Sequence, residues 1–171
     1  MERSVARAPD DREHFLQEVV GALAETIEQV VGLDQAQGFI AVVGDKIGRA
    51  IDAEYRGRAG GGEMRLDQVA EALVDFKRRI DGGFSIAAID AQGVVLVNTR
   101  CPYGREVLGR ESLCMMTSTV FGRMAAENLG FAHVRIDEAI ARGDRRCVVS
   151  IRFDEDAPGR SIGGRSYFRT G

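Results

Sequence analysis

Apolar residues three and four positions apart predict three helices in the first half of the chain. The first runs from residue 11 to Gly32, with an aspartate at its start to cap the free N–H groups. The second covers residues 34–55 and the third residues 66–80, with the glycine-rich loop 59–63 between them. The apolar face of the first helix consists of Phe15, Leu16, Val19, Val20, Leu23, Ile27, Val30 and Val31. That of the second consists of Phe39, Ile40, Val43, Ile47 and Ile51, and that of the third of Val69, Leu73, Phe76 and Ile80. The face of the first helix either packs on its own domain or forms a dimer.

Two glycines and three cations add detail to these helices. Gly44 and Gly48 lie four positions apart, so they share a face of the second helix and allow a neighbouring backbone to come close. Lys77, Arg78 and Arg79 occupy the last turn of the third helix, where positive charge complements the helix dipole. These three side chains could bind an anion or a partner, but we expect them simply to lie at the surface.

The second half of the chain changes to a period of two, which is typical of strands. Residues 84–90 and 94–98 form a predicted hairpin around a short glycine-containing turn. A helix is expected over residues 112–129, followed by strands at 131–136 and 147–153. Antiparallel strands with helices segregated to one side make an α+β fold. The order is N-terminal helices followed by an antiparallel sheet, made of a hairpin, a helix and two further strands.

One domain accounts for most of the chain. Residues 11–155 form a single predicted α+β domain, because 171 residues suit one hydrophobic core. Residues 1–10 are expected to be disordered. The Gly-, Arg- and Ser-rich residues 156–171 are expected to form a flexible C-terminal tail, from which Tyr167 and Phe168 can dock on the body.

Composition narrows the setting in which the protein works. Hydrophobic residues make up 44% and charged residues 29%, as in ordinary globular domains. The net charge of -3 argues against non-specific nucleic-acid binding, which needs clustered cations. No apolar run reaches the roughly 20 residues that span a bilayer, and the N-terminal sequence lacks a secretory signal. We therefore expect a cytoplasmic protein with reduced thiols and no membrane contact.

The three cysteines are the candidate chemistry. Cys114 lies near the start of a predicted helix with Ser112 as its cap, so the helix dipole should lower its pKa. Cys101 lies in the loop after the hairpin, and Cys147 begins the last strand. If that strand pairs beside the hairpin, all three sulfurs reach the same end of the sheet. Zn²⁺ or an iron–sulfur cluster would relieve the repulsion among three converging thiolates.

Several residues could complete or adjoin such a site. The fourth ligand could be a water or one of Glu111, His133, Glu138 and Asp144. The spacing of the cysteines is not the C-x-x-C of typical zinc sites, and small buried hydrophobes are the other interpretation of all three. Apolar residues between hairpin and helices form either a small-ligand pocket or plain core: Phe84, Ile86, Val95, Val97, Val120, Phe121 and Met124.

Four segments resemble the methanogen output domain family of prokaryotic signalling proteins. They are the runs LVDFKRRIDGGF, CPYGREVLGRESLCMMTSTVFG, AAENLGFA and IARGDRRC, in that order along the chain. The second half is more distantly similar to the 4-vinyl reductase domain, in which a cysteine opens a helix and a G-D-x-x-C element opens the last strand. Cys114 and Cys147 fit those two places. Aromatic-sensing transcription regulators share that domain and hold zinc with cysteines and a glutamate, but a further cysteine of theirs is absent near Ile140 and Ala141.

The resemblance implies a cytoplasmic sensor or output domain in signal transduction. Cys101, Cys114 and Cys147 would bind the metal or cluster, a small ligand would enter the apolar pocket, and the domain would act through a signalling partner. A homodimer through the N-terminal helices is expected, and no direct nucleic-acid binding. The sequence favours a role without catalysis. The alternatives are a thiol redox enzyme that uses Cys114 with Cys101 as the resolving thiol, and an adaptor with inert cysteines.

Overall fold

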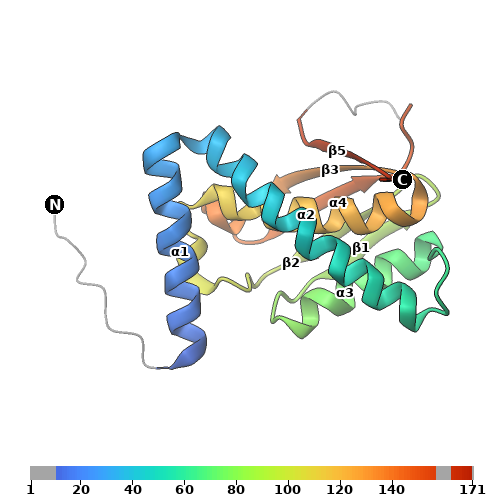
Figure 1. Ribbon diagram of the computed structural model, residues 1–171, viewed down its shortest axis with the longest axis horizontal. Helices are drawn as coiled ribbons and strands as arrows, with labels where there is room; N and C mark the ends of the chain where they lie inside the picture. The colour runs from blue at the N-terminus through green and yellow to red at the C-terminus, as the bar shows by residue number, and fades with distance from the viewer. Residues whose placement is uncertain (1–10, 157–162, 171) are drawn as a thin grey trace, which may run out of the picture.

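Five antiparallel strands form one sheet, and helices are stacked on one side of it (Figure 1). The computed structural model describes residues 11–156 and 163–170. The helices are α1 (Arg12–Val31), α2 (Leu33–Arg58), α3 (Leu66–Arg79) and α4 (Cys114–Leu129), and the strands are β1 (Ser85–Asp90), β2 (Gly93–Asn98), β3 (Phe131–Glu138), β4 (Cys147–Arg152) and β5 (Arg165–Phe168). Short 3-10 turns lie at Gly104–Val107, Glu111–Leu113 and Ile140–Arg142. The predicted α+β class is confirmed, and the predicted disordered segment 1–10 lies outside the described residues.

The sheet has the strand order β1-β2-β4-β3-β5. The hairpin of β1 and β2 is extended by β4, which pairs antiparallel with β2 from Gly93↔Arg152 to Asn98↔Cys147. Helix α4 packs on the sheet, and α2 packs over α4. The main core lies between these helices and the sheet, around Leu96, Phe121 and Met124. No helix among the described residues is long and apolar enough to span a membrane.

Helix α2 approaches α4 through glycines, as their spacing predicts. A Cβ atom at Gly44 would lie 3.0 Å from Cβ of Thr119, and one at Gly48 would lie 3.3 Å from Cα of Val120. Side chains at these two positions would hold the helices apart. The predicted close crossing is therefore confirmed.

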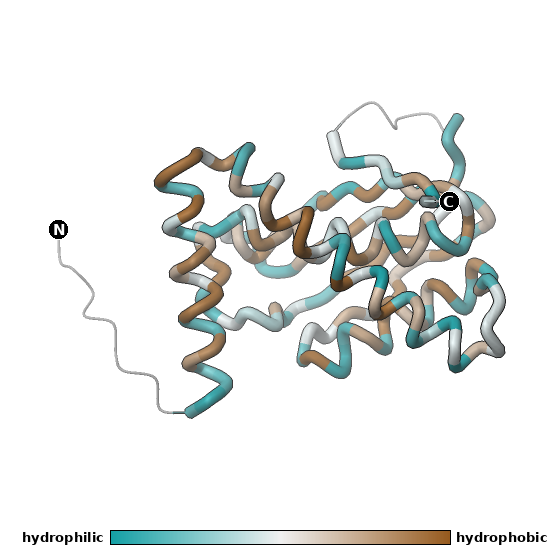
Figure 2. Tube along the Cα trace, in the orientation of Figure 1, coloured by the Kyte–Doolittle hydropathy of each residue, from teal (hydrophilic) through white to brown (hydrophobic). Residues whose placement is uncertain are grey.

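The predicted buried face of α2 is wrong for Phe39, Val43 and Ile47, which are exposed, whereas Ile40 and Ile51 pack partly buried against the cores. Helix α2 buries Ala36, Gly44, Gly48, Asp52 and Tyr55, the face that its glycines allow to approach α4. The apolar residues on the other side remain exposed: Phe15, Leu16, Val19, Leu23 and Val30 on α1, and Phe39, Val42, Val43 and Ile47 on α2. Figure 2 shows apolar positions along α1 and through the first half of α2, away from the sheet.

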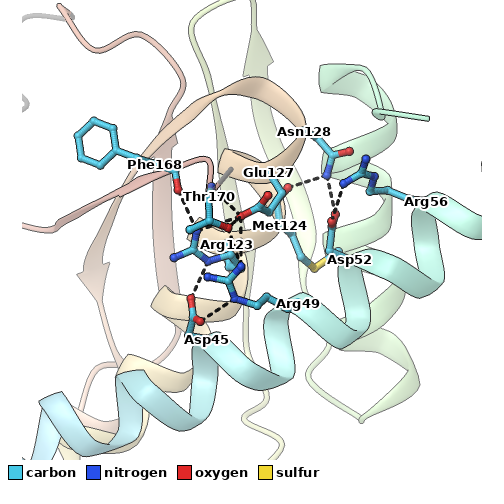
Figure 3. Close-up of polar contacts among 10 residues, drawn as sticks. All are labelled: Asp45, Arg49, Asp52, Arg56, Arg123, Met124, Glu127, Asn128, Phe168 and Thr170. Atoms are coloured by element: carbon cyan, nitrogen blue, oxygen red, sulfur yellow. Dashed lines mark hydrogen bonds and ion pairs between the residues drawn. The ribbon is translucent and has the colours of Figure 1, made fainter. Parts of the chain in front are cut away.

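A polar network joins α2, α4 and the C-terminal strand (Figure 3). Arg123 donates to Asp45 Oδ1 at 2.6 Å and to the carbonyl of Phe168 at 2.8 Å. The buried Asn128 donates to Asp52 Oδ1 at 2.6 Å and accepts from the N–H of Met64. These side chains satisfy buried polar groups along the α2–α4 crossing and so fix its register.

The C-terminal residues belong partly to the sheet. The predicted flexible tail, 156–171, contains β5, which pairs antiparallel with β3. Tyr167 is buried against Gly122, where a Cβ atom would overlap its ring, and its hydroxyl lies 2.9 Å from Ser118 Oγ. The docking of Tyr167 therefore adds a fifth strand to the four that the sequence predicts.

The glycine crossing can be tested by two leucine substitutions in the same helix. Gly48→Leu should lower the free energy of unfolding by about 1–3 kcal/mol, because the side chain overpacks against Arg123 and Val120. Gly57→Leu should raise it by roughly 0.5–1 kcal/mol, because no atom lies within 4 Å of its Cβ position and leucine favours helix. Urea unfolding measures both. Equal effects of the two changes would contradict the close crossing.

Candidate functional site

The three cysteines line one small cavity at the end of the sheet. Cys101 follows β2, Cys114 opens α4 and Cys147 opens β4. The rest of the lining is largely apolar: Phe84, Asn98, Pro102, Tyr103, Val107, Leu113, Thr117, Ile136, Ile140, Ala141 and Val149. The cavity volume is about 30 Å³, more than the roughly 10–15 Å³ that one water molecule needs.

Asn98 holds the ends of the two central strands together at this cavity. Its side-chain amide donates to the carbonyls of Gly82 and Arg100, at 2.8 and 2.6 Å. Its Oδ1 accepts from the N–H of Cys147 at 3.2 Å. The same buried side chain therefore positions the start of β4 and the loop that carries Cys101.

Lys77 is buried beside the cysteines, so its predicted surface position is wrong. Only 2% of the residue is exposed. Its Nζ donates to Thr117 Oγ1 at 2.7 Å and lies 5.7 and 5.3 Å from the ring centres of Phe84 and Phe121. Within the described residues no carboxylate forms an ion pair with it, and its electrostatic neighbours are the three thiols.

The sequence contains a signal that could have located Lys77. It lies four positions after Leu73 and eight after Val69, both fully buried, so it shares the inward face of α3. The basic run that contains Lys77 favours a surface position, and that interpretation is correct for Arg78 and Arg79.

Burial governs the ionisation of the whole cluster. It raises the pKa of Cys114 to about 12, and raises the pKa values of Cys101 and Cys147 as well. The predicted lowering of the Cys114 pKa is therefore wrong. Ser112 does not cap the helix, since its Oγ has no hydrogen-bond partner and α4 begins after a 3-10 turn. Burial also lowers the pKa of Lys77 to about 8, and the thiols partly oppose that change.

The residues at the cavity do not fit a metal centre as they stand. Among the described residues, no group of three or more His, Cys, Asp or Glu side chains is arranged to hold a metal ion. The candidate fourth ligands also have other partners. Glu138 pairs with Arg146, Glu111 with Arg142, His133 contacts Ser166 and Gly163, and Asp144 accepts from the N–H of Ala139.

The apolar residues expected to line a ligand pocket are dispersed. Of this set only Phe84 lines the cysteine cavity. Val120, Phe121 and Met124 fill the main core. Ile86 and Val95 line separate surface hollows, and Val97 is half-buried in β2.

Helix α1 is attached to the segment that carries the cavity wall. We define the cavity segment as residues 99–113. Gln17 donates to the carbonyl of Pro102 at 3.0 Å, Glu28 accepts from the N–H of Ser112 at 3.0 Å, and Glu25 pairs with Arg110 at 2.6 Å. Beneath these contacts Ala24 packs in a second core with Val107, Leu113 and Ala141, three residues of the cavity lining. A change in the cavity wall would therefore act directly on α1.

Comparison with known proteins gives a family and a fold. The family description of methanogen output domain 1 matches residues 19–152. A solved structure of a trafficking protein particle complex subunit 3 from Naegleria fowleri, covalently bound to palmitic acid, has a TM-score of 0.60 and 14% sequence identity. The match covers 92% of this chain and 98% of that chain, and it shows a shared fold. No curated protein sequence matches the chain.

Replacing the buried cation should change stability in a pH-dependent way. Burial without an anionic partner costs about 3 kcal/mol, from the fall of the Lys77 pKa from 10.5 to about 8. Lys77→Met should raise the free energy of unfolding at pH 7 by about 1–2 kcal/mol, because the lost bond to Thr117 offsets part of that gain.

From about pH 8 to pH 10 the folded wild type loses the Lys77 proton while the unfolded chain keeps it, so this group adds stability as the pH rises. The unfolded thiols ionise over the same range while burial keeps the folded thiols protonated, which lowers the stability of wild type and variants alike. The stabilisation of Lys77→Met relative to the wild type should therefore shrink from pH 7 to about pH 10, whereas the difference between the wild type and Lys46→Met, at an exposed position, should stay constant. Urea unfolding across this pH range decides, and an effect of Lys77→Met that does not change with pH would contradict the buried charge.

Proposed function

The chain belongs to the methanogen output domain 1 family, and we propose that this signalling output domain passes the state of its cysteine cavity to a protein partner through α1 and α2. The observation that carries the proposal is the attachment of α1 to the cavity segment, by three side-chain contacts and a shared core. The outer side of α1 is apolar and exposed. One helix therefore contacts the cavity segment on one side and offers a binding surface on the other.

The partner that best suits this surface is a second copy of the chain. Leu16, Val19, Leu23, Thr26 and Val30 alternate in steps of three and four along the exposed side of α1, and we call them the α1 seam. Leu23 is 58% and Val30 76% exposed. The exposed apolar residues Phe39, Val42, Val43 and Ile47 of α2 extend this surface, as a stable interface of roughly 800 Å² per partner requires.

The cavity would act as a sensor whose occupancy or thiol state moves its wall. A volume of about 30 Å³ leaves no room in this cavity for a fatty acyl chain such as the palmitic acid bound to the structural neighbour. A metal centre would require the three sulfurs to move together. A cytoplasmic location and a role in transcription regulation remain predictions from the sequence.

The redox-enzyme alternative, with Cys114 as nucleophile and Cys101 as resolving thiol, finds less support. A reactive thiol needs a thiolate, and burial raises the pKa of both groups. The positive neighbours, Lys77 for Cys101 and Arg142 for Cys114, do not reverse that effect.

A charge in the α1 seam should abolish the homodimer. Leu23→Glu should give a monomer, because a carboxylate cannot be buried at the centre of an apolar interface without a partner. Ile89→Glu is the matched control, since Ile89 is 45% exposed but lies on β1, outside both helices and the cavity segment. Sedimentation velocity measures the three proteins. A wild type that is monomeric at every concentration would exclude the homodimer.

Filling the cavity should loosen α1. In Ala141→Leu the added carbons exceed the free volume, so the cavity segment must shift and its contacts with α1 should weaken. Hydrogen exchange should then be faster in α1 while the amides of β2, β3 and β4 keep their protection. Ala88→Leu, on the exposed edge strand β1, is the control. Unchanged exchange in α1 would show that the cavity and the seam are not coupled.

A further inference from the structure

The Lys77 ammonium is a buried charge without a counter-ion of its own. Its neighbours are one hydroxyl, three aromatic rings and three thiols that burial keeps protonated. Cation–ring contacts and a single hydrogen bond compensate only part of the loss of hydration. Lysine is rarely this buried without a partner, so the position is built to receive negative charge.

Thr117 connects this charge to the cavity. Its Oγ1 accepts a hydrogen bond from Lys77 Nζ at 2.7 Å, and Thr117 is part of the cavity lining. No hydrogen bond donated by that hydroxyl occurs within residues 11–156 and 163–170. A hydroxyl that accepts from an ammonium is polarised and becomes a stronger donor, so its own proton is available to a ligand in the cavity.

The size and polarity of the cavity restrict the ligand. Its volume of about 30 Å³ admits two or three heavy atoms after small shifts of the lining. Its walls are apolar apart from the thiols, Asn98, Tyr103 and Thr117, so a strongly hydrated ion such as sulfate or phosphate would lose more hydration than one cation restores. Three sulfur atoms make the wall polarisable, which suits a soft ion.

We propose that the cysteine cavity binds a small, monovalent, weakly hydrated anion of two or three heavy atoms, held by the Thr117 hydroxyl and the charge of Lys77. The inference rests on the proposed function, for which it names the class of signal. An anion in the cavity turns Lys77 from an unpaired charge into half of an ion pair. Its atoms contact Cys101 and Leu113 of the cavity segment, and through that segment the bound state reaches α1.

Azide is the probe that tests this site. The infrared stretch of azide should show a second, narrower band that saturates at one azide per chain, with sulfate used to hold the ionic strength constant. Lys77→Met should raise the dissociation constant for azide at least tenfold, since a hydrogen bond to a charged group contributes about that much to affinity. Thr117→Val, which keeps the side-chain shape and removes the hydroxyl, should also raise the dissociation constant. The sequence contains one other lysine, Lys46, and the control variant Lys46→Met should bind azide like the wild type.

Several results would overturn the inference. They are the absence of a saturable band in the wild type, equal affinity in a folded Lys77→Met or Thr117→Val variant, and a band that disappears when zinc or iron is removed by a chelator. Sedimentation of the same samples separates the two proposals. A wild type that dimerises but binds no azide overturns this inference alone, and one that binds azide but stays monomeric overturns the dimeric relay alone.

Discussion

The close crossing of α2 and α4 is the constraint on which the rest of the structure depends. Gly44 and Gly48 let the two backbones approach, and Arg123 and Asn128 fix the register with Asp45 and Asp52. Because the glycine face is the one that is buried, the apolar residues on the other side of α2 are left at the surface. The same packing holds α4 on the sheet, with Cys114 and Thr117 facing the end where β2 and β4 meet. Both the exposed surface and the cavity therefore follow from one helix contact.

At that end of the sheet the fold carries a cost in free energy that a purely structural core would avoid. A methionine in place of Lys77 would fill the same space beside Phe84 and Phe121 without a buried charge. Asn98, Tyr103 and Thr117 bring further polar atoms to a cavity whose other walls are largely apolar. Polar groups that weaken a core are expected where the protein binds a ligand, and α1 lies directly behind this cavity wall.

The sequence predicts most of the elements but not which faces they bury. Hydrophobic periodicity located four helices and four strands, and glycine spacing located the α2–α4 crossing. Helices α1 and α2 carry apolar residues on more than one side, and only tertiary packing selects the buried side. Lys77 was assigned to the surface because a basic run at a helix end usually lies there. Strand β5 was missed because its four residues lack a hydrophobic pattern and are ordered by Tyr167 docking on Gly122. The convergence of the cysteines was foreseen from topology, whereas their pKa values depend on burial, which spacing does not reveal.

The buried Lys77 ammonium, unpaired among thiols, is the central feature of this site, and nuclear magnetic resonance can observe it directly. The chain has two lysines, so carbon-13 labelling at Cε gives two signals, and Lys77→Met identifies the one from Lys77. We expect this signal to titrate near pH 8, because burial lowers the pKa of Lys77 from 10.5 to about 8. A titration near pH 10.5 would show an ammonium in contact with water, and would contradict both the buried charge and the anion site built on it.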